Sequence, residues 1–460
     1  MSRLAKPGFR VALAPVFVAH MALPASEARS APDPVKTMSA RSFPPFVLPE
    51  PTGPHRIGVR DFEVVDPGRA ETFRPDLGQR RRIMVRVWYP AVPAAGAVPR
   101  PYRTPVEALL MAPNLAESLG LADTTFDEIG AGPTHSVSNA PAEPARIPYP
   151  VVVFSHGYLG TVDTNTALME ELASHGVVVF SITHPFESAA VVYPQGDAVV
   201  LDASVKAYMT ARTLDPDTET LLHSKVVGDR YEATRRLYSQ TTRLSQSAPI
   251  WRDDFISVLD AIEAGRTDQD VQSIVAQADL RRLIFAGMSF GGPAAIGACQ
   301  KDLRCLGAIN LDGREVSLGL FDRPVRAPTL MVYSGGGFKL SGFGYNDFFY
   351  EPVRAIGHRP EVRRMVVPEA GHWDFTDYTL LPKGDASMPA LPASLRGPIE
   401  GRHMIRLVND LFLDFISRYA GAGQGRVTSQ PIDEAARVQD VTAIAQWAVA
   451  ADRTIPQGER

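Results

Sequence analysis

The chain has 460 residues, long enough for one large domain or two smaller ones. Hydrophobic residues make up 45% and charged residues 21% of the sequence, as in ordinary globular proteins, which excludes a wholly disordered chain. The formal net charge of -4 leaves no excess of basic residues, so nucleic acid is excluded as an expected partner.

Residues 1–30 have the pattern of a secretory signal peptide. The basic start contains Arg3, Lys6 and Arg10, an apolar run follows at 11–24, and small residues after it offer cleavage sites. We therefore expect export to a periplasm or to the medium. The alternative is a disordered cytoplasmic leader. No other stretch approaches the roughly 18 apolar residues that a membrane span requires.

The next part of the chain is rich in loops. Residues 31–55 contain many Pro, Ser and Ala residues and are expected to form a linker. Two β-like runs follow at 55–66 and 81–90, where β-branched and aromatic residues cluster. One short helix is expected near 105–120 within a Pro-, Ala- and Gly-rich stretch.

From about residue 148, short apolar runs alternate with amphipathic segments. Runs such as "YPVVVFSHG" are typical of strands that are buried on both faces. The expected strands cover 149–157, 177–185, 281–289, 306–313, 327–337 and 362–372, and the expected helices cover 164–176, 251–265 and 403–421. This alternation predicts an α/β domain over 56–420, with a mostly parallel, doubly wound sheet and helices on both faces.

Two segments stand outside this alternation. Residues 186–250 carry mixed charge between a strand and its helix, and we interpret them as a cap or lid insertion. Residues 421–460 form a polar tail with one weak amphipathic helix at 434–450. No chemistry is predicted for that tail.

The chain has two cysteines, Cys299 and Cys305, six positions apart. Outside the cytoplasm we expect such a pair to close as a local disulfide. The alternative is one buried and one exposed thiol. No cluster of residues with metal-ligand spacing accompanies them, so we expect neither a metal nor another cofactor.

The stretch "RLIFAGMSFGGPAAIGA" places Ser289 in a Gly-x-Ser-x-Gly motif between an expected strand and an expected helix. The motif alone is weak, because it also occurs by chance. A strained strand-to-helix turn needs small residues on both sides of the serine, and Gly287 and Gly291 supply them. Pro293 suits the first turn of the helix. This context predicts a nucleophile; the alternative is an ordinary loop serine.

A nucleophilic serine needs a base, which in this type of fold follows the serine in the chain. The histidines in that part of the sequence are His358, His372 and His403. His403 starts the last helix and His358 precedes a strand, whereas His372 follows a strand and a short turn. We expect His372 to reach the same sheet edge as Ser289 and to act as the base; the alternative is a surface loop histidine.

The imidazole in turn needs an acid that holds its tautomer. Asp312 ends the strand that follows the nucleophile, and the next strand offers no acid before Asp347. Asp374 and Asp377 are too close in sequence to His372 to orient its ring easily. We therefore expect Asp312 to be the acid, with Asp347 as the alternative.

The oxyanion of an acyl-transfer intermediate needs hydrogen-bond donors. One is the backbone N–H of Phe290, directly after the nucleophile. The second is expected in the turn "FSHGYLG", where Gly157 allows a close backbone approach and Tyr158 supplies the N–H. His156 precedes the nucleophile and is expected to brace this loop.

Apolar and aromatic residues surround these positions in the sequence. Leu159, Trp373 and Phe375 are expected to line a largely apolar acyl pocket. A glycine-rich aromatic loop at 335–352 offers two interpretations, transient contact with a lipid surface or packing under a cap.

Five stretches resemble a known family: "PVVVFSHGYLG", "LASHGVVVFSITHP", "GMSFGG", "NLDG" and "GHWDFTDYTL". They are similar to the plasma-type platelet-activating factor acetylhydrolases and their bacterial relatives, serine esterases of the α/β-hydrolase fold. The resemblance covers roughly residues 148–380. It implies a Ser289–His372–Asp312 triad, with Phe375 and Asp377 completing the His-x-x-Phe-x-Asp pattern. The sequence departs from the pattern at Met288, where many relatives have histidine.

The resemblance implies hydrolysis of carboxylic esters through an acyl-enzyme, with a small-molecule or lipid ester of short acyl length as substrate. Within enzymes, the alternatives are a general carboxylesterase or polyester hydrolase and an acyltransferase. From another class, the alternative is a non-catalytic binding protein on a hydrolase scaffold. The sequence does not fix the oligomeric state.

Overall fold

The structure is a computed structural model. It describes residues 46–119, 129–210, 220–222, 224–240, 242–335, 339–340, 343–344, 346–357, 360–383, 395–421, 436–438 and 442–452. The predicted signal peptide at 1–30, the first part of the predicted linker and His358 lie outside the described residues. Among those that are described, no helix combines the length and apolar character needed to cross a membrane.

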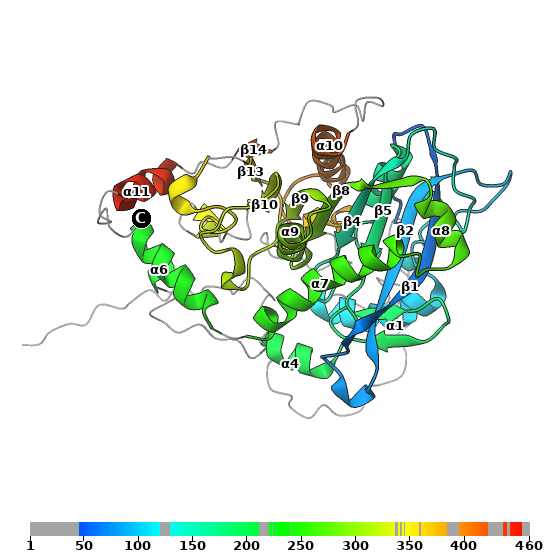
Figure 1. Cartoon of the computed structure of the whole chain (residues 1–460), viewed down its shortest axis with the longest axis horizontal. Helices are drawn as coiled ribbons and strands as arrows, with labels where there is room; N and C mark the ends of the chain where they lie inside the picture. The colour runs from blue at the N-terminus through cyan, green and yellow to red at the C-terminus, as the bar shows by residue number, and fades with distance from the viewer. Residues whose placement is uncertain are drawn as a thin grey trace, which may run out of the picture.

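One large sheet forms the centre of the domain. Its strands are β1 (Arg56–Ala70), β2 (Arg80–Ala91), β3 (Ser136–Ser138), β4 (Tyr149–Ser155), β5 (Val178–Ile182), β8 (Ala278–Met288), β9 (Cys305–Leu311), β10 (Thr329–Ser334), β13 (Val362–Val367) and β14 (Arg437–Val438). Their order is β14-β13-β10-β9-β8-β4-β5-β2-β1-β3 (Figure 1). The six strands from β13 to β5 are parallel, and β2 pairs antiparallel with both β5 and β1. The predicted mostly parallel sheet is confirmed.

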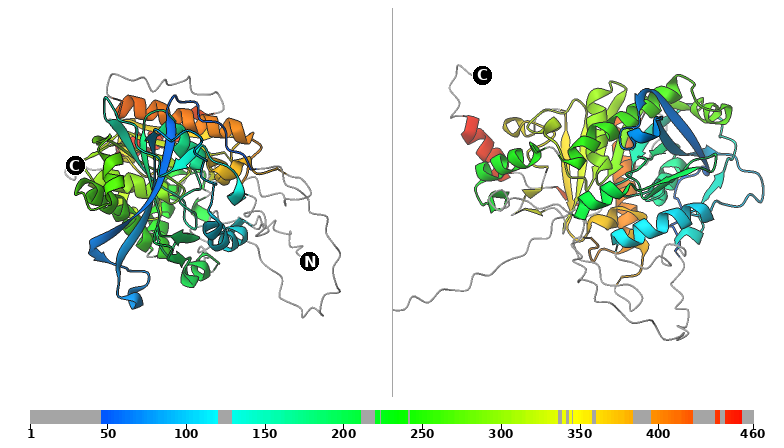
Figure 2. Two further views of the ribbon diagram at one scale, coloured as in Figure 1. Left: turned by 90° about the vertical axis from the view of Figure 1, so that its right-hand side faces the viewer. Right: turned by 90° about the horizontal axis from the view of Figure 1, so that it is seen from below.

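Helices cover both faces of this sheet (Figure 2). Helices α7 (Arg243–Glu263), α8 (Gln269–Val275) and α9 (Gly291–Lys301) pack on one face, and α3 (Thr166–Ser174) and α10 (Gly401–Tyr419) pack on the other. Successive side chains of a strand point to opposite faces, so Val151 and Val153 belong to the first core and Val152 and Phe154 to the second. The continuous apolar runs of the sequence therefore fill two cores.

Helix α7 begins earlier than the sequence pattern predicts. We expected it near residue 251, but it starts at Arg243, and Thr242 and Ser245 form a capping box at its first turn. Pro249 lies inside this helix. Because a proline normally interrupts a helix, the sequence pattern did not indicate the two turns before it.

The end of the predicted linker packs against the domain. Phe46 and Leu48 are buried in an apolar cluster with α1 (Pro105–Leu119), and the rings of Phe46 and Tyr102 lie 5.1 Å apart. The backbone N–H of Thr52 donates to Glu171 at 2.8 Å. The described residues before β1 are thus anchored at several points.

The segment predicted as an insertion contains β6 (Ala190–Val192), β7 (Ala198–Val200), α4 (Ala203–Thr210) and α6 (Val227–Tyr238). The tail helix α11 (Thr442–Asp452) packs beside α6, as Figure 2 shows. The rings of Tyr231 and Trp447 lie 5.3 Å apart in this contact. The apolar side of the tail helix is therefore buried against the inserted segment and against Phe348 and Val353.

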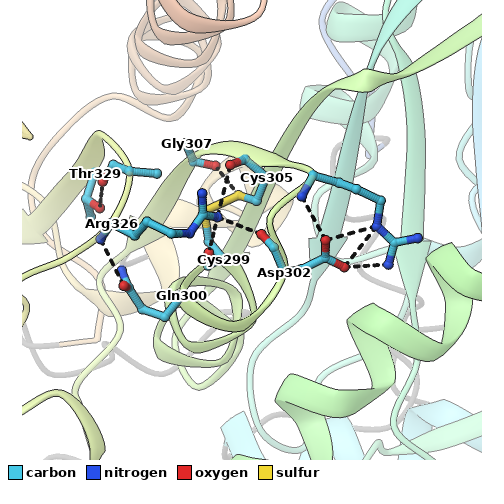
Figure 3. The surroundings of a disulfide bond; sticks show 9 residues. Cys299, Gln300, Asp302, Cys305, Gly307, Arg326 and Thr329 are labelled. Atoms are coloured by element: carbon cyan, nitrogen blue, oxygen red, sulfur yellow. Dashed lines mark hydrogen bonds and ion pairs between the residues drawn. A yellow bond between two sulfur atoms is a disulfide. The ribbon is translucent and has the colours of Figure 1, made fainter.

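Cys299 and Cys305 form a disulfide between the end of α9 and the start of β9 (Figure 3). The guanidinium of Arg326 crosses this turn, and its Nη2 donates to the carbonyl oxygens of Cys299, Asp302 and Cys305 at 2.6, 2.6 and 3.1 Å. The bond and these contacts tie α9, the helix that follows Ser289, to the next strand.

We expect replacement of both cysteines by alanine to lower the free energy of unfolding by about 2 kcal/mol, since the short closed loop restricts the unfolded chain. Thermal unfolding of the wild type and the double variant measures this effect. The wild type under reducing conditions should lose a similar amount. An unchanged unfolding midpoint in both experiments would show that the disulfide is dispensable for stability.

Candidate active site

Ser289 occupies a tight turn between β8 and α9. Its φ is +54°, in the left-handed region that side chains rarely adopt, and its N–H donates to the carbonyl of Leu311 at 2.7 Å. A Cβ at Gly287 would lie 2.3 Å from backbone atoms of Gly291, and one at Gly291 would lie 2.3 Å from the carbonyl oxygen of Ser155. The two glycines of the motif are therefore required by the space around the turn.

His372 and Asp312 reach this serine from the ends of two other strands of the sheet, β13 and β9. His372 Nε2 lies 3.0 Å from Ser289 Oγ, and His372 Nδ1 lies 2.7 Å from Asp312 Oδ2. Asp312 directly follows β9, and His372 begins a short 3-10 helix (His372–Phe375) after β13. The structure brings together all three predicted triad residues at the carboxyl edge of the sheet.

Burial and hydrogen bonds determine which ring nitrogen of His372 donates and which accepts. Asp312 is fully buried, and its other oxygen, Oδ1, accepts from the backbone N–H of Ser334 at 2.7 Å. A carboxylate only accepts hydrogen bonds when ionised, so His372 Nδ1 carries the proton and Nε2 is left as an acceptor. Nε2 can then accept the hydroxyl proton of Ser289, which is the geometry required of a general base.

The other candidate acids do not orient the ring of His372. Both ring nitrogens of His372 are engaged, by Ser289 and Asp312, which leaves neither for Asp347. Asp374 accepts the backbone N–H groups of Gly371 and Gly397 at 2.8 and 2.6 Å. Asp377 accepts the hydroxyl of Tyr102 at 3.0 Å. These two acids hold the loop that carries His372 and do not orient its ring.

The loop after β4 lies directly beside the serine. A Cβ on Gly157 would lie 2.9 Å from Ser289 Cβ, so only glycine allows the observed approach. The carbonyl of Gly157 accepts from His156 Nδ1 at 2.7 Å and from Gly160 N at 2.9 Å. In a trans peptide the N–H points opposite to the carbonyl, so these contacts fix the direction of the Tyr158 N–H.

Within the part of the chain that the structure describes, the backbone N–H groups of Tyr158 and Phe290 have no protein acceptor. Buried N–H groups are normally paired, so two unpaired ones beside a candidate nucleophile need an explanation. An incoming oxyanion would supply the acceptor.

The three residues predicted to line an acyl pocket do not come together. Phe375 is buried in the core under α10, Trp373 packs against the α1 cluster, and Leu159 packs against the core on the opposite face of the sheet. Trp373 and Phe375 are close to His372 in sequence, but their side chains do not share its direction. The 3-10 turn at His372–Phe375 points Phe375 into the core.

A cavity of about 650 Å³ lies beside the turn instead, between α7, α9 and residues 315–324. Its lining includes Phe290, the residue after the candidate nucleophile. This cavity was not predicted; its signal in the sequence is the row of small and apolar residues at helical spacing on α9, among them Pro293, Ala294 and Gly297.

Glu315 also lines this cavity and is only 4% exposed. Burial raises the pKa of Glu315 to about 7, although the backbone N–H groups of Val316 and Ser317 donate to its carboxyl group. The folded protein therefore holds a proton on Glu315 that the unfolded chain releases near pH 4.5.

This difference predicts a pH dependence of stability. The stabilisation from protonated Glu315 is fully present below pH 4.5 and is lost as the pH rises through about 7. Relative to Glu315→Gln, the wild type should lose up to about 3 kcal/mol of unfolding free energy between pH 4.5 and pH 8.5. Urea unfolding of both proteins at the two pH values measures the difference. Parallel pH profiles would show that Glu315 is ionised throughout.

A second Ser–His–Asp arrangement, missed by the sequence analysis, lies deeper in the domain. His184 contacts Ser155 Oγ through Nε2 and Asp254 Oδ2 through Nδ1, both at 2.8 Å. All three residues are 0% exposed, whereas Ser289 is 6% exposed and the His372 side chain 14%. Burial lowers the pKa of His184 to about 4, so this ring is neutral at neutral pH. No substrate can reach a fully buried serine, so we interpret this set as structural.

The family model described as "Platelet-activating factor acetylhydrolase, isoform II" matches residues 41–432. The platelet-activating factor acetylhydrolase of Cavia porcellus is 25% identical over 275 residues, which cover 59% of this chain and 58% of that protein. That of Bos taurus is 24% identical over 277 residues, 59% of this chain and 57% of that protein. The matched segment thus spans a little over half the length of these relatives.

Among solved structures, a ferulic acid esterase from Streptomyces cinnamoneus matches with a TM-score of 0.61 and 21% sequence identity. The match covers 86% of this chain and 99% of that one. At this identity the likeness concerns the fold, and it confirms the expected α/β-hydrolase architecture.

Proposed function

The chain belongs to the platelet-activating factor acetylhydrolase, isoform II, family, and from this premise we propose that it hydrolyses carboxylic esters through an acyl-enzyme on Ser289. The observation that carries the proposal is the unbroken chain of contacts from Ser289 Oγ through His372 to Asp312, at 3.0 and 2.7 Å. Such a chain is what an unactivated hydroxyl needs in order to attack an ester carbonyl.

In the first half of the reaction, Ser289 Oγ attacks the ester carbonyl carbon and its proton passes to His372 Nε2. The carbonyl oxygen becomes an oxyanion, which accepts the backbone N–H groups of Tyr158 and Phe290. His372 then donates the proton to the leaving alcohol oxygen as the carbon–oxygen bond breaks. Asp312 stabilises the imidazolium that exists between these two transfers.

In the second half, water replaces the alcohol. His372 removes a proton from the water as its oxygen attacks the acyl carbon, and the same two N–H groups hold the second oxyanion. The bond to Ser289 breaks, its oxygen takes back the proton from His372, and the carboxylic acid leaves. One water is consumed and one acid and one alcohol are released.

We propose esters with short acyl groups, including lipid-like esters, as the substrate class. The names of the relatives support this class, and the cavity beside Phe290 offers apolar surface for the remainder of the ester. Transient contact with a lipid surface is part of the same proposal.

We propose that the protein acts outside the cytoplasm. The signal-like pattern at residues 1–30 supports this, and so does the Cys299–Cys305 disulfide, since disulfides persist in oxidising compartments.

An ester panel that varies acyl length and alcohol group tests the substrate class. We expect kcat/KM to be highest for acetyl to butyryl esters and to fall for long acyl chains. A flat response to acyl length would favour a general carboxylesterase, and formation of a new ester from added alcohol would favour an acyltransferase. No turnover of any ester would favour a binding protein and contradict the proposal.

A further inference from the structure

Trp251 on α7 lies at the centre of an aromatic cluster that the triad does not use. The indole is fully buried, and the ring of His184 stacks on it at 3.6 Å with an interplanar angle of 10°. Tyr158 also stacks on it, at 5.7 Å and 27°, and Phe290 meets it edge-on at 4.8 Å and 85°. The side chains of both proposed oxyanion residues therefore rest on one indole.

Glu187 anchors this cluster by hydrogen bonds. Its Oε2 accepts the indole N–H of Trp251 at 2.7 Å, and its Oε1 accepts the hydroxyls of Tyr158 and Ser247 at 2.6 and 2.5 Å. Its backbone carbonyl accepts the N–H of Leu159 at 3.0 Å. Glu187 is 0% exposed, so no water competes for these contacts. One buried carboxyl group thus links the loop after β4 to α7.

The other stacking partner is also held in place. His184 Nδ1 donates to Asp254, which is ion-paired with Arg81 at 2.7 Å, and all of these side chains are buried. Although burial alone would raise it, the nearby Arg81 keeps the pKa of Asp254 low, so the carboxylate stays ionised and orients the ring. The His184 ring on which Trp251 stacks is therefore held by buried polar contacts.

We propose that Trp251 and Glu187 are positioning residues that set the two oxyanion donors, the N–H groups of Tyr158 and Phe290, relative to Ser289. This inference rests on the proposed function. The two donors come from loops far apart in sequence, and the cluster is where their side chains meet, with the rings of Tyr158 and Phe290 5.1 Å apart. Oxyanion stabilisation depends on donors placed within a few tenths of an ångström, so a loosened cluster should slow the reaction without weakening substrate binding.

The first test is Trp251→Phe, which keeps an aromatic ring but removes the indole N–H and part of the stacking surface. We expect kcat for an activated acetyl ester to fall about 10- to 100-fold while KM changes by less than about threefold. A trifluoromethyl ketone, which forms a tetrahedral adduct with the serine, should bind more weakly by a similar factor.

Two further variants separate positioning from stability. Glu187→Gln preserves side-chain size but cannot accept all of the donors, and we expect a loss of about 5- to 10-fold in kcat. Trp88→Phe is the matched control: Trp88 is 1% exposed, and its indole N–H has no hydrogen-bond partner in the described structure. It should lower the unfolding midpoint, though by less than Trp251→Phe does because it removes no hydrogen bond, and leave kcat within about twofold.

Amide hydrogen exchange supplies a readout that does not need activity. Exchange at Leu159, whose N–H donates to the backbone carbonyl of Glu187, should be faster in Trp251→Phe and Glu187→Gln, and unchanged in Trp88→Phe. Unchanged kcat and unchanged exchange in both cluster variants, or equal losses in the Trp88→Phe control, would overturn the inference. A wild type that hydrolyses no ester, with exchange still responding, would instead reject the proposed function and the oxyanion role of the two N–H groups, and would leave only a structural link between the cluster and the loop after β4.

Discussion

Replacement of Ser289 by alanine is expected to lower kcat for ester hydrolysis about 10⁶-fold, to a residual rate ~10³–10⁴-fold above that in water. Without the hydroxyl no acyl-enzyme can form, and only the oxyanion donors and substrate binding remain. The measurement is steady-state hydrolysis of an activated short-acyl ester by purified wild type and variant.

Folding of this variant is checked by its unfolding midpoint. Ser289 has a φ of +54° that alanine must also adopt, so a shift of a few degrees is compatible with the account. Retention of more than about 1% of the wild-type kcat would contradict a nucleophilic role for this serine.

Replacement of Asp312 by asparagine is expected to lower kcat about 10⁴-fold. The amide can present N–H groups to His372 Nδ1, which favours the tautomer that carries its proton on Nε2. That nitrogen could then no longer accept the proton of Ser289, although it lies only 3.0 Å from Oγ. The loss of kcat is measured by comparing Asp312→Asn with the wild type at a pH where both proteins are folded.

Asp347→Asn is the matched control, because Asp347 is also buried, at 1% exposure, and was the alternative acid. It should keep kcat within about threefold of the wild type. The reverse order of effects, with Asp347→Asn nearly inactive and Asp312→Asn nearly normal, would move the role of the acid to Asp347.

Most of the fold could be predicted from the sequence, because the signals are local. Apolar runs such as that of β4 and the stripe of α10 set the element type directly, and their alternation set the parallel sheet. The start of α7 was missed because Pro249 breaks the local pattern while the capping box at Thr242 begins the helix anyway. The capping box, a local signal, therefore set that boundary in spite of the proline.

The contacts among Ser289, His372 and Asp312 were predictable for a different reason. Each of these residues follows a strand of a parallel sheet, so topology alone brings them to one edge. Their catalytic roles remain predictions until the variants are measured.

The cluster around Trp251 and the direction of Phe375 could not be predicted. Glu187 and Trp251 are 64 positions apart, and the first lies in a segment that the sequence analysis assigned to a cap. Nothing in the local pattern of either residue indicates a partner. Buried side-chain networks of this kind depend on how distant elements pack, which spacing along the chain does not encode.

The most direct test of the central claim is active-site labelling with a fluorophosphonate, followed by peptide mapping. We expect one equivalent of label on Ser289, no label on the buried Ser155 although it also contacts a histidine, and loss of labelling in Ser289→Ala. Labelling at any other serine, or no labelling of a folded and ester-hydrolysing wild type, would contradict the account.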